Sequence, residues 1–117
     1  MADSFLNQFN EEVNHFVNER DWSQFQTPKN LSMALIVEAA ELVVHFQWMQ
    51  PKESDSLSSD KKVKVGEELA DIFIYTLRLA DRLEIDLQQA AQDKLTKNRK
   101  KYPADKVRGH ATKYTEL

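Results

Sequence analysis

The stretch Leu31–Met49, which reads LSMALIVEAAELVVHFQWM, sets the expectation for the whole fold. Its apolar residues go all the way round a helical wheel, and a helix of that kind is normally buried on most sides. It nevertheless carries two carboxylates, Glu38 and Glu41, three residues apart. Residues at this spacing share one helix face, with Cβ atoms roughly 5–6 Å apart. Because a buried ionised carboxylate is costly unless a cation compensates it, the pair predicts a metal site.

A second apolar stretch, Val63–Leu83 (VKVGEELADIFIYTLRLADRL), repeats the arrangement with Glu68 and Asp71. The chain thus contains ExxE, 26 intervening residues and ExxD. Two helices joined by a short connection favour antiparallel packing, which would bring the four carboxylates together in one crevice. A site made only of carboxylate oxygens suits Mg²⁺ or Mn²⁺ and does not suit zinc or copper.

Length and composition point to a single helical domain over residues 1–117. With two glycines and three prolines, few positions break the chain. The absence of cysteine excludes disulfides, cysteine-ligated metals and thiol nucleophiles. The polar start of the chain is unlike a signal peptide, and the most apolar stretch is interrupted by charge, so a cytoplasmic protein is expected.

The net charge of −3 hides an asymmetry along the chain. Residues 1–93 hold 17 acidic and 8 basic side chains, whereas residues 94–117 hold 2 acidic and 8 basic side chains. A basic tail can bind nucleic acid or the phosphates of a small ligand. Because the rest of the chain is acidic and would repel a nucleic acid polymer, the small phosphate ligand is favoured.

The expected architecture is an all-α bundle of four helices followed by a basic tail. Helix signals place these helices at residues 4–20, 28–49, 60–83 and 86–102. In the last of them, Leu87, Ala90, Ala91 and Leu95 are expected to face inward. Pro103–Leu117 shows no clear periodicity.

Aromatic residues near the carboxylates suggest a stacking pocket for a base. Trp48 lies at the end of the first carboxylate helix, and Tyr75 lies one turn beyond Asp71. Trp22 lies in an aromatic loop after the first helix, and each of the three could also be a plain core residue. Lys94 and Asn98 share a face of the fourth helix that could equally be solvated surface.

Three other classes of protein share parts of this pattern. A di-iron bundle needs two ExxH motifs, and this chain has one, formed by Glu12 and His15. A nucleotide-binding sensor would keep the metal and the aromatic pocket without hydrolysis. A purely structural helical oligomer would not need four carboxylates together with aromatic and basic residues.

The order of motifs resembles the MazG-like all-α nucleoside triphosphate pyrophosphohydrolases, and within them the dCTP pyrophosphatase branch. The resemblance runs from about His15 to the C-terminus. It is carried by RDWSQFQTPKNL, EAAELVVHFQW, EELADIFIY, DLQQA and NRKKYP…RGHATKYTEL.

This resemblance implies Mg²⁺-dependent hydrolysis of a (deoxy)nucleoside triphosphate, such as dCTP or a modified dCTP, to the monophosphate and pyrophosphate. It implies a role in cleansing the nucleotide pool and a homodimer or homotetramer whose sites a neighbouring subunit completes. It also implies that the site residues fall into three groups: metal-binding and catalytic Glu38, Glu41, Glu68 and Asp71; base-binding His15, Trp22, Trp48 and Tyr75; and phosphate- or sugar-binding Lys94 and Asn98, with Arg82 nearby.

Overall fold

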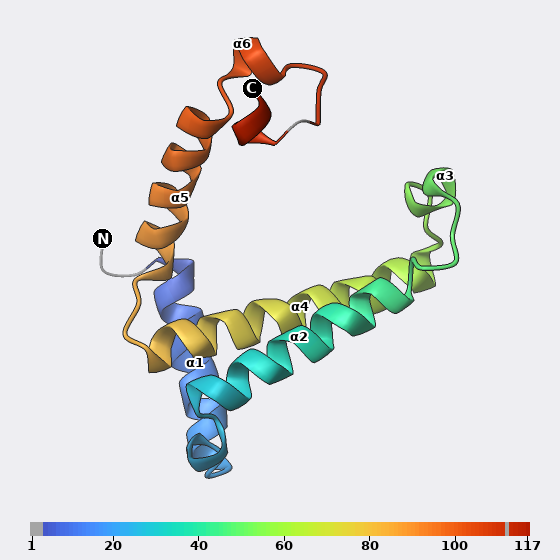
Figure 1. Ribbon diagram of the computed structural model, residues 1–117. Coiled ribbons are helices and arrows are strands. Elements are labelled where there is room, and N and C mark those ends of the chain that lie inside the picture. Colours follow the sequence, from blue (N-terminus) through green and yellow to red (C-terminus); the bar gives the residue numbers. More distant parts are fainter. Residues whose placement is uncertain (1–3, 112) are drawn as a thin grey trace. The chain divides into compact units, whose positions relative to one another are not determined.

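The computed structural model describes residues 4–111 and 113–117, and this part of the chain contains helices and no strand. The expected all-α class is confirmed. The elements are α1 (Phe5–Glu19), the 3₁₀ turn η1 (Ser23–Phe25), α2 (Pro28–Val44), α3 (Pro51–Ser54), α4 (Ser59–Arg82), α5 (Leu87–Lys101), α6 (Ala104–Val107) and the 3₁₀ turn η2 (Tyr114–Glu116) (Figure 1). None of the described helices is both long enough and apolar enough to cross a bilayer.

The chain forms two compact units, Met1–Glu84 and Ile85–Leu117. In the first unit, α2 and α4 lie side by side and antiparallel, as predicted, and α1 packs across the end of the pair where α2 begins (Figure 1). The buried core lies where these three helices meet and consists of Val13, Val17, Leu31, Leu77 and Ala80. The antiparallel pair is the element that brings the two carboxylate motifs face to face.

Side-chain caps fix where the long helices begin. The Thr27 hydroxyl accepts a hydrogen bond from the backbone N–H of Asn30 at 3.2 Å, and Pro28 occupies the first helical position. Asp86 caps α5 in the same way. For α4 the Ser58 hydroxyl accepts from the N–H of Lys61 at 3.2 Å, so the helix begins at Ser59, one residue before the start predicted from the sequence.

Two other expectations about the first unit were wrong. The helix from Pro28 ends at Val44 and not at Met49, because hydrogen bonds between residues three apart tighten the chain into a turn from His45 onward. Nor is α2 buried on most sides. Only Leu31 is buried in this helix, and its exposed large apolar side chains are Met33, Ile36, Val37, Val43 and Val44.

The second unit consists of α5, α6 and η2. The residues of α5 that were expected to face inward are mostly exposed, because within its own unit this helix has only α6 and η2 to cover it. The basic tail, which shows no clear periodicity in the sequence, contains α6 and η2. The Tyr102 and Tyr114 rings meet edge to face at 5.9 Å, and the Lys101 ammonium lies 4.7 Å from the centre of the Tyr114 ring.

A buried arginine ties α1 and the following loop to α4. Arg78 is 4 % exposed, and burial lowers its pKa. Its guanidinium donates to Gln26 Oε1 at 2.9 Å and to Asn14 Oδ1, and it lies 3.5 Å from Asp81. Asn10 in turn donates to Asp81 at 2.9 Å. One cation thus satisfies acceptors from three segments of the first unit.

Replacing Arg78 with Met should lower the free energy of unfolding by about 3 kcal/mol, because the substitution removes a buried donor and leaves the half-buried acceptors of Asn14 and Gln26 without it. Urea unfolding at fixed protein concentration measures this. Lys64→Met, on an exposed position of the same helix, is the control and should change stability by less than about 0.5 kcal/mol. Equal unfolding midpoints for the Arg78 and Lys64 variants would contradict the anchoring role.

Candidate metal centre

Three carboxylates converge between α2 and α4. One oxygen from each of Glu38, Glu41 and Glu68 lies within 4.8 Å of the other two. Glu38 and Glu68 are half-buried, whereas Glu41 is exposed. The two helices bring them together because each motif lies on the face that its helix turns toward the other. Three anionic groups at this spacing repel one another unless a cation lies among them.

The pKa of Glu38 reflects its burial first and this repulsion second. Burial raises its pKa from 4.5 to about 7, and a hydrogen bond with Glu41 and the charges of Glu41, Asp71 and Glu68 add to the effect. Without a cation, Glu38 therefore keeps a proton at a pH where an ordinary glutamate has lost it. All four predicted carboxylates contribute to a single electrostatic cluster.

The donor atoms fit a divalent cation. The Oε2 atoms of Glu38 and Glu68 are buried, and within the described residues neither has a hydrogen-bond partner. Among those residues, no lysine or arginine lies within 4.0 Å of the four carboxylates. Buried carboxylate oxygens without a donor are costly by themselves and are the ligands that hard cations such as Mg²⁺ and Mn²⁺ prefer. These residues can therefore hold a divalent metal ion.

Asp71 and Tyr75 border the three glutamates. Asp71 is exposed and lies outside the closely spaced group, but its charge raises the pKa of Glu38. Burial raises the pKa of the Tyr75 hydroxyl, and the charges of Glu38 and Asp71 raise it further. Tyr75 therefore lies beside the carboxylates, as its position one turn after Asp71 predicted.

The other predicted base-binding residues do not meet Tyr75 in one closed pocket. His15 is exposed and pairs with Glu19, its Nε2 lying 3.4 Å from Oε1. Trp22 packs edge to face on Phe16 and is 44 % exposed, and Trp48 is 89 % exposed. The two tryptophans flank opposite ends of α2, a helix of 17 residues and therefore roughly 25 Å long. One chain alone cannot stack both indoles on the same base.

Lys94 and Asn98 belong to α5, in the second unit. Lys94 is exposed and Asn98 is half-buried. Their assignment to phosphate or sugar therefore stays a prediction. Arg82 lies in the first unit, at the end of α4, where it donates to the backbone carbonyl of Ser23 at 3.4 Å.

Two residues near the carboxylates were not predicted as site residues. His45 lies 3.8 Å from Glu68, and Lys61 contacts His45 at 3.3 Å. The sequence carried a signal for His45, because it follows Glu41 by four residues and so shares its helix face. For Lys61 there was no such signal, since its contact with His45 depends on how α2 and α4 pack.

Comparisons with known proteins identify the family of this chain. The sequence pattern of the MazG-like family matches residues 33–117, which include all four carboxylates. The chain belongs to the MazG-like family.

Its relatives include the protein dCTP pyrophosphatase 1 from Bos taurus, 44 % identical over 104 residues, and that from Homo sapiens, 42 % identical over 104 residues. These alignments cover 87 % of this chain but 62 % and 61 % of those proteins, so the chain spans about three fifths of the length of these curated relatives. A crystal structure of a pyrophosphatase from Archaeoglobus fulgidus matches with a TM-score of 0.81 and 35 % identity, covering 86 % of this chain and 94 % of that one. The resemblance read from the motifs is confirmed.

The raised pKa of Glu38 predicts how stability depends on pH in the metal-free protein. The unfolded chain ionises this group near pH 4.5 and the folded chain near pH 7. The folded state therefore binds more protons between these values, and stability falls as the pH rises through that window. Glu38→Gln, which stays neutral, should raise Tm in the presence of EDTA, by more at pH 8 than at pH 5.

Thermal unfolding at the two pH values measures the difference. Glu67→Gln is the matched control, because Glu67 adjoins Glu68 but is exposed and lies outside the close group. An increase in Tm for Glu38→Gln that is the same at pH 5 and pH 8 would contradict the electrostatic origin of the effect.

Proposed function

We propose that this protein is a nucleoside triphosphate pyrophosphohydrolase that uses Mg²⁺ and acts on dCTP or a modified dCTP. The observation that carries the proposal is the group of carboxylates between α2 and α4, with two buried oxygens that have no donor among the described residues. Membership of the MazG-like family and the names of its relatives, dCTP pyrophosphatase 1, support the same reaction and the choice of base.

The proposed reaction hydrolyses the anhydride bond between the α- and β-phosphates. The oxygen of water forms a bond with one phosphorus, the bridging oxygen leaves with the other phosphate, and the products are a nucleoside monophosphate and pyrophosphate. A carboxylate of the cluster accepts the proton that the water releases. Mg²⁺, when bound, neutralises charge on the triphosphate and helps to orient the attacking water.

The protein residues supply position and charge. Glu38, Glu41, Glu68 and Asp71 hold the cation through carboxylate oxygens, as their chemistry favours. Lys94 and Asn98 contact the phosphates or the sugar, and Tyr75 borders the base. Phosphoryl transfer depends chiefly on such positioning and electrostatics, so this set of groups suffices for the chemistry.

A second copy of the chain completes the base pocket in this proposal. The exposed apolar side chains of α2 support it, because a row of this kind is normally covered in the working protein. The separation of Trp22 from Trp48 supports it too, since indoles at opposite ends of α2 can share a base only if they come from different chains. The oligomer is a homodimer or a homotetramer.

The reaction is tested by pyrophosphate release from a panel of dNTPs and NTPs, with Mg²⁺ and with EDTA. We expect release only with Mg²⁺, fastest for a cytosine deoxynucleotide. Glu41→Gln and Asp71→Asn should each lower kcat/KM at least about 100-fold with unchanged circular dichroism, whereas Glu67→Gln should not. Binding of dCTP without release of pyrophosphate by the folded wild type would favour a nucleotide sensor instead.

The oligomer is tested by light scattering coupled to size exclusion. Wild-type protein should have the mass of two or four chains, and Ile36→Asp should yield monomers because it places a charge within the apolar row of α2. Lys52→Asp, an exposed charge change on α3, is the control and should keep the wild-type mass. A wild-type monomer at all concentrations would contradict this part of the proposal.

A further inference from the structure

His45 connects the candidate metal centre to a lysine that takes no part in it. It lies just after the last residue of α2, and its side chain is 16 % exposed. Its Nδ1 is 3.3 Å from Lys61 Nζ, and its Nε2 is 3.8 Å from Glu68 Oε1. The imidazole thus lies between a cation on one side and a carboxylate of the cluster on the other.

The chemistry of these groups determines where the imidazole proton lies. A lysine ammonium has three donors and no acceptor, so His45 Nδ1 must accept the hydrogen bond. An accepting Nδ1 carries no proton, and the proton of a neutral imidazole is then on Nε2. The N–H of Nε2 faces Glu68 Oε1. At 3.8 Å this contact is an electrostatic attraction and is longer than a hydrogen bond.

The two oxygens of Glu68 therefore have different surroundings. Oε1 faces His45, whereas Oε2 is buried and has no hydrogen-bond partner within the described part of the chain. A carboxylate attracted at one oxygen by an N–H has a restricted orientation, and the other oxygen is left for a cation. Groups that hold metal ligands in this way commonly change metal affinity 10–100-fold when they are removed.

We propose that His45 is a positioning residue, held in its Nε2–H tautomer by Lys61, and that it orients Glu68 for the divalent cation. This inference rests on the metal site of the proposed function and adds a Lys61–His45–Glu68 chain to it. His45 does not touch the cation or the substrate in this arrangement. It acts through Glu68.

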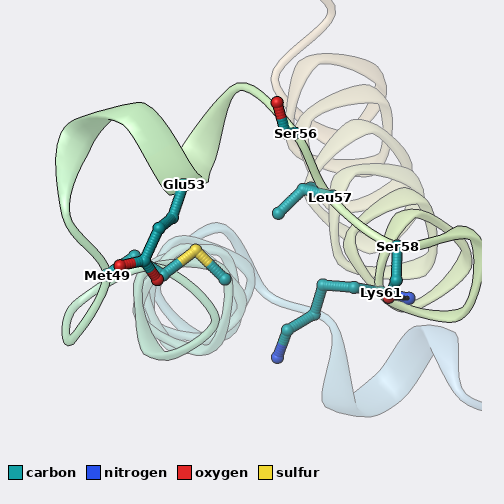
Figure 2. Close-up of a pocket in the computed structure, with 6 residues that line it drawn as sticks. All are labelled: Met49, Glu53, Ser56, Leu57, Ser58 and Lys61. Carbon is teal, nitrogen blue, oxygen red and sulfur yellow. Dashed lines mark hydrogen bonds between the residues drawn. The ribbon is translucent and has the colours of Figure 1, made fainter.

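The surroundings of Lys61 allow its hydrogen bond to His45 to be removed without disturbing the packing. Lys61 lines an open cavity of about 350 Å³, whose other lining residues are Met49, Glu53, Ser56, Leu57 and Ser58. Figure 2 shows the Lys61 side chain extending from α4 into the space between the helices. A methionine side chain fits the same space, so Lys61→Met removes the hydrogen bond without overpacking.

The tautomer is tested without metal or activity. The chain has three histidines, so ¹⁵N NMR of the imidazoles in the full-length protein at pH 8 gives few signals, and His45→Gln assigns the signal of His45. We expect wild-type His45 to be protonated on Nε2 and the Lys61→Met variant to populate the Nδ1–H form. A wild-type Nδ1–H tautomer, or a tautomer that Lys61→Met leaves unchanged, would overturn the proposal.

The positioning role is tested by Mn²⁺ affinity from calorimetry. His45→Leu should weaken binding 10–100-fold. His45→Gln should restore most of the affinity, because the Gln amide N–H can occupy the place of the Nε2–H. Lys62→Met, an exposed neighbour of Lys61, should bind as wild type does.

The outcomes separate this inference from the proposed function. If wild type binds Mn²⁺ and Glu68→Gln does not, the metal site stands. If His45→Leu then binds Mn²⁺ as tightly as wild type, or if His45→Gln binds it as weakly as His45→Leu, the positioning role of His45 is refuted. The metal site itself then still stands. A wild-type protein that binds no Mn²⁺ refutes both.

Discussion

Repulsion among carboxylates between two apolar helices is the constraint on which this structure depends. Packing α2 against α4 buries apolar surface, and the same packing forces Glu38, Glu41 and Glu68 within 4.8 Å of one another. The cluster is relieved in part by the proton that Glu38 retains, its pKa being raised to about 7. A divalent cation would relieve it more completely, because it would also satisfy the buried Oε2 atoms of Glu38 and Glu68. The packing of α2 on α4 thus brings like charges together at the place where a cation would bind.

The remainder of the first unit holds this arrangement in place. Arg78 joins α1 and the loop before α2 to α4 through a buried donor network, and the aromatic stack of Phe5, Phe9 and Phe73 links α1 to α4 with ring centres 5.4–6.4 Å apart. The large apolar side chains on the exposed row of α2 are left uncovered by α1 and α4.

Local rules in the sequence were enough to predict where the long helices begin, within one residue, and which helix faces carry the paired carboxylates. The spacing of three between Glu38 and Glu41, and between Glu68 and Asp71, places each pair on one helix face whatever the rest of the fold does. Thr27–Pro28 and Asp86 mark helix starts through their own side-chain chemistry. These features depend only on residues a few positions apart, so the sequence alone predicts them.

What could not be predicted depends on contacts between distant residues. The apolar residues of α2 predicted a helix buried on most sides, whereas most of its large apolar side chains are exposed, because α1 and α4 cover only part of its surface. Helix α2 ends at Val44 because the chain tightens there into a turn, and the residues of that stretch are apolar enough to have continued the helix. Lys61 contacts His45, 16 residues away in the sequence, and Arg78 contacts Asn14, 64 residues away. No local sequence pattern predicts either contact.

The most direct test of this account is a crystal structure with Mn²⁺ and a non-hydrolysable α,β-imido analogue of dCTP, with data collected for the anomalous signal of manganese. We expect an anomalous peak at bonding distance from Oε2 of both Glu38 and Glu68, on the side of Glu68 away from His45. Ordered analogue with no manganese peak between α2 and α4, or a peak ligated only by residues outside this cluster, would contradict it.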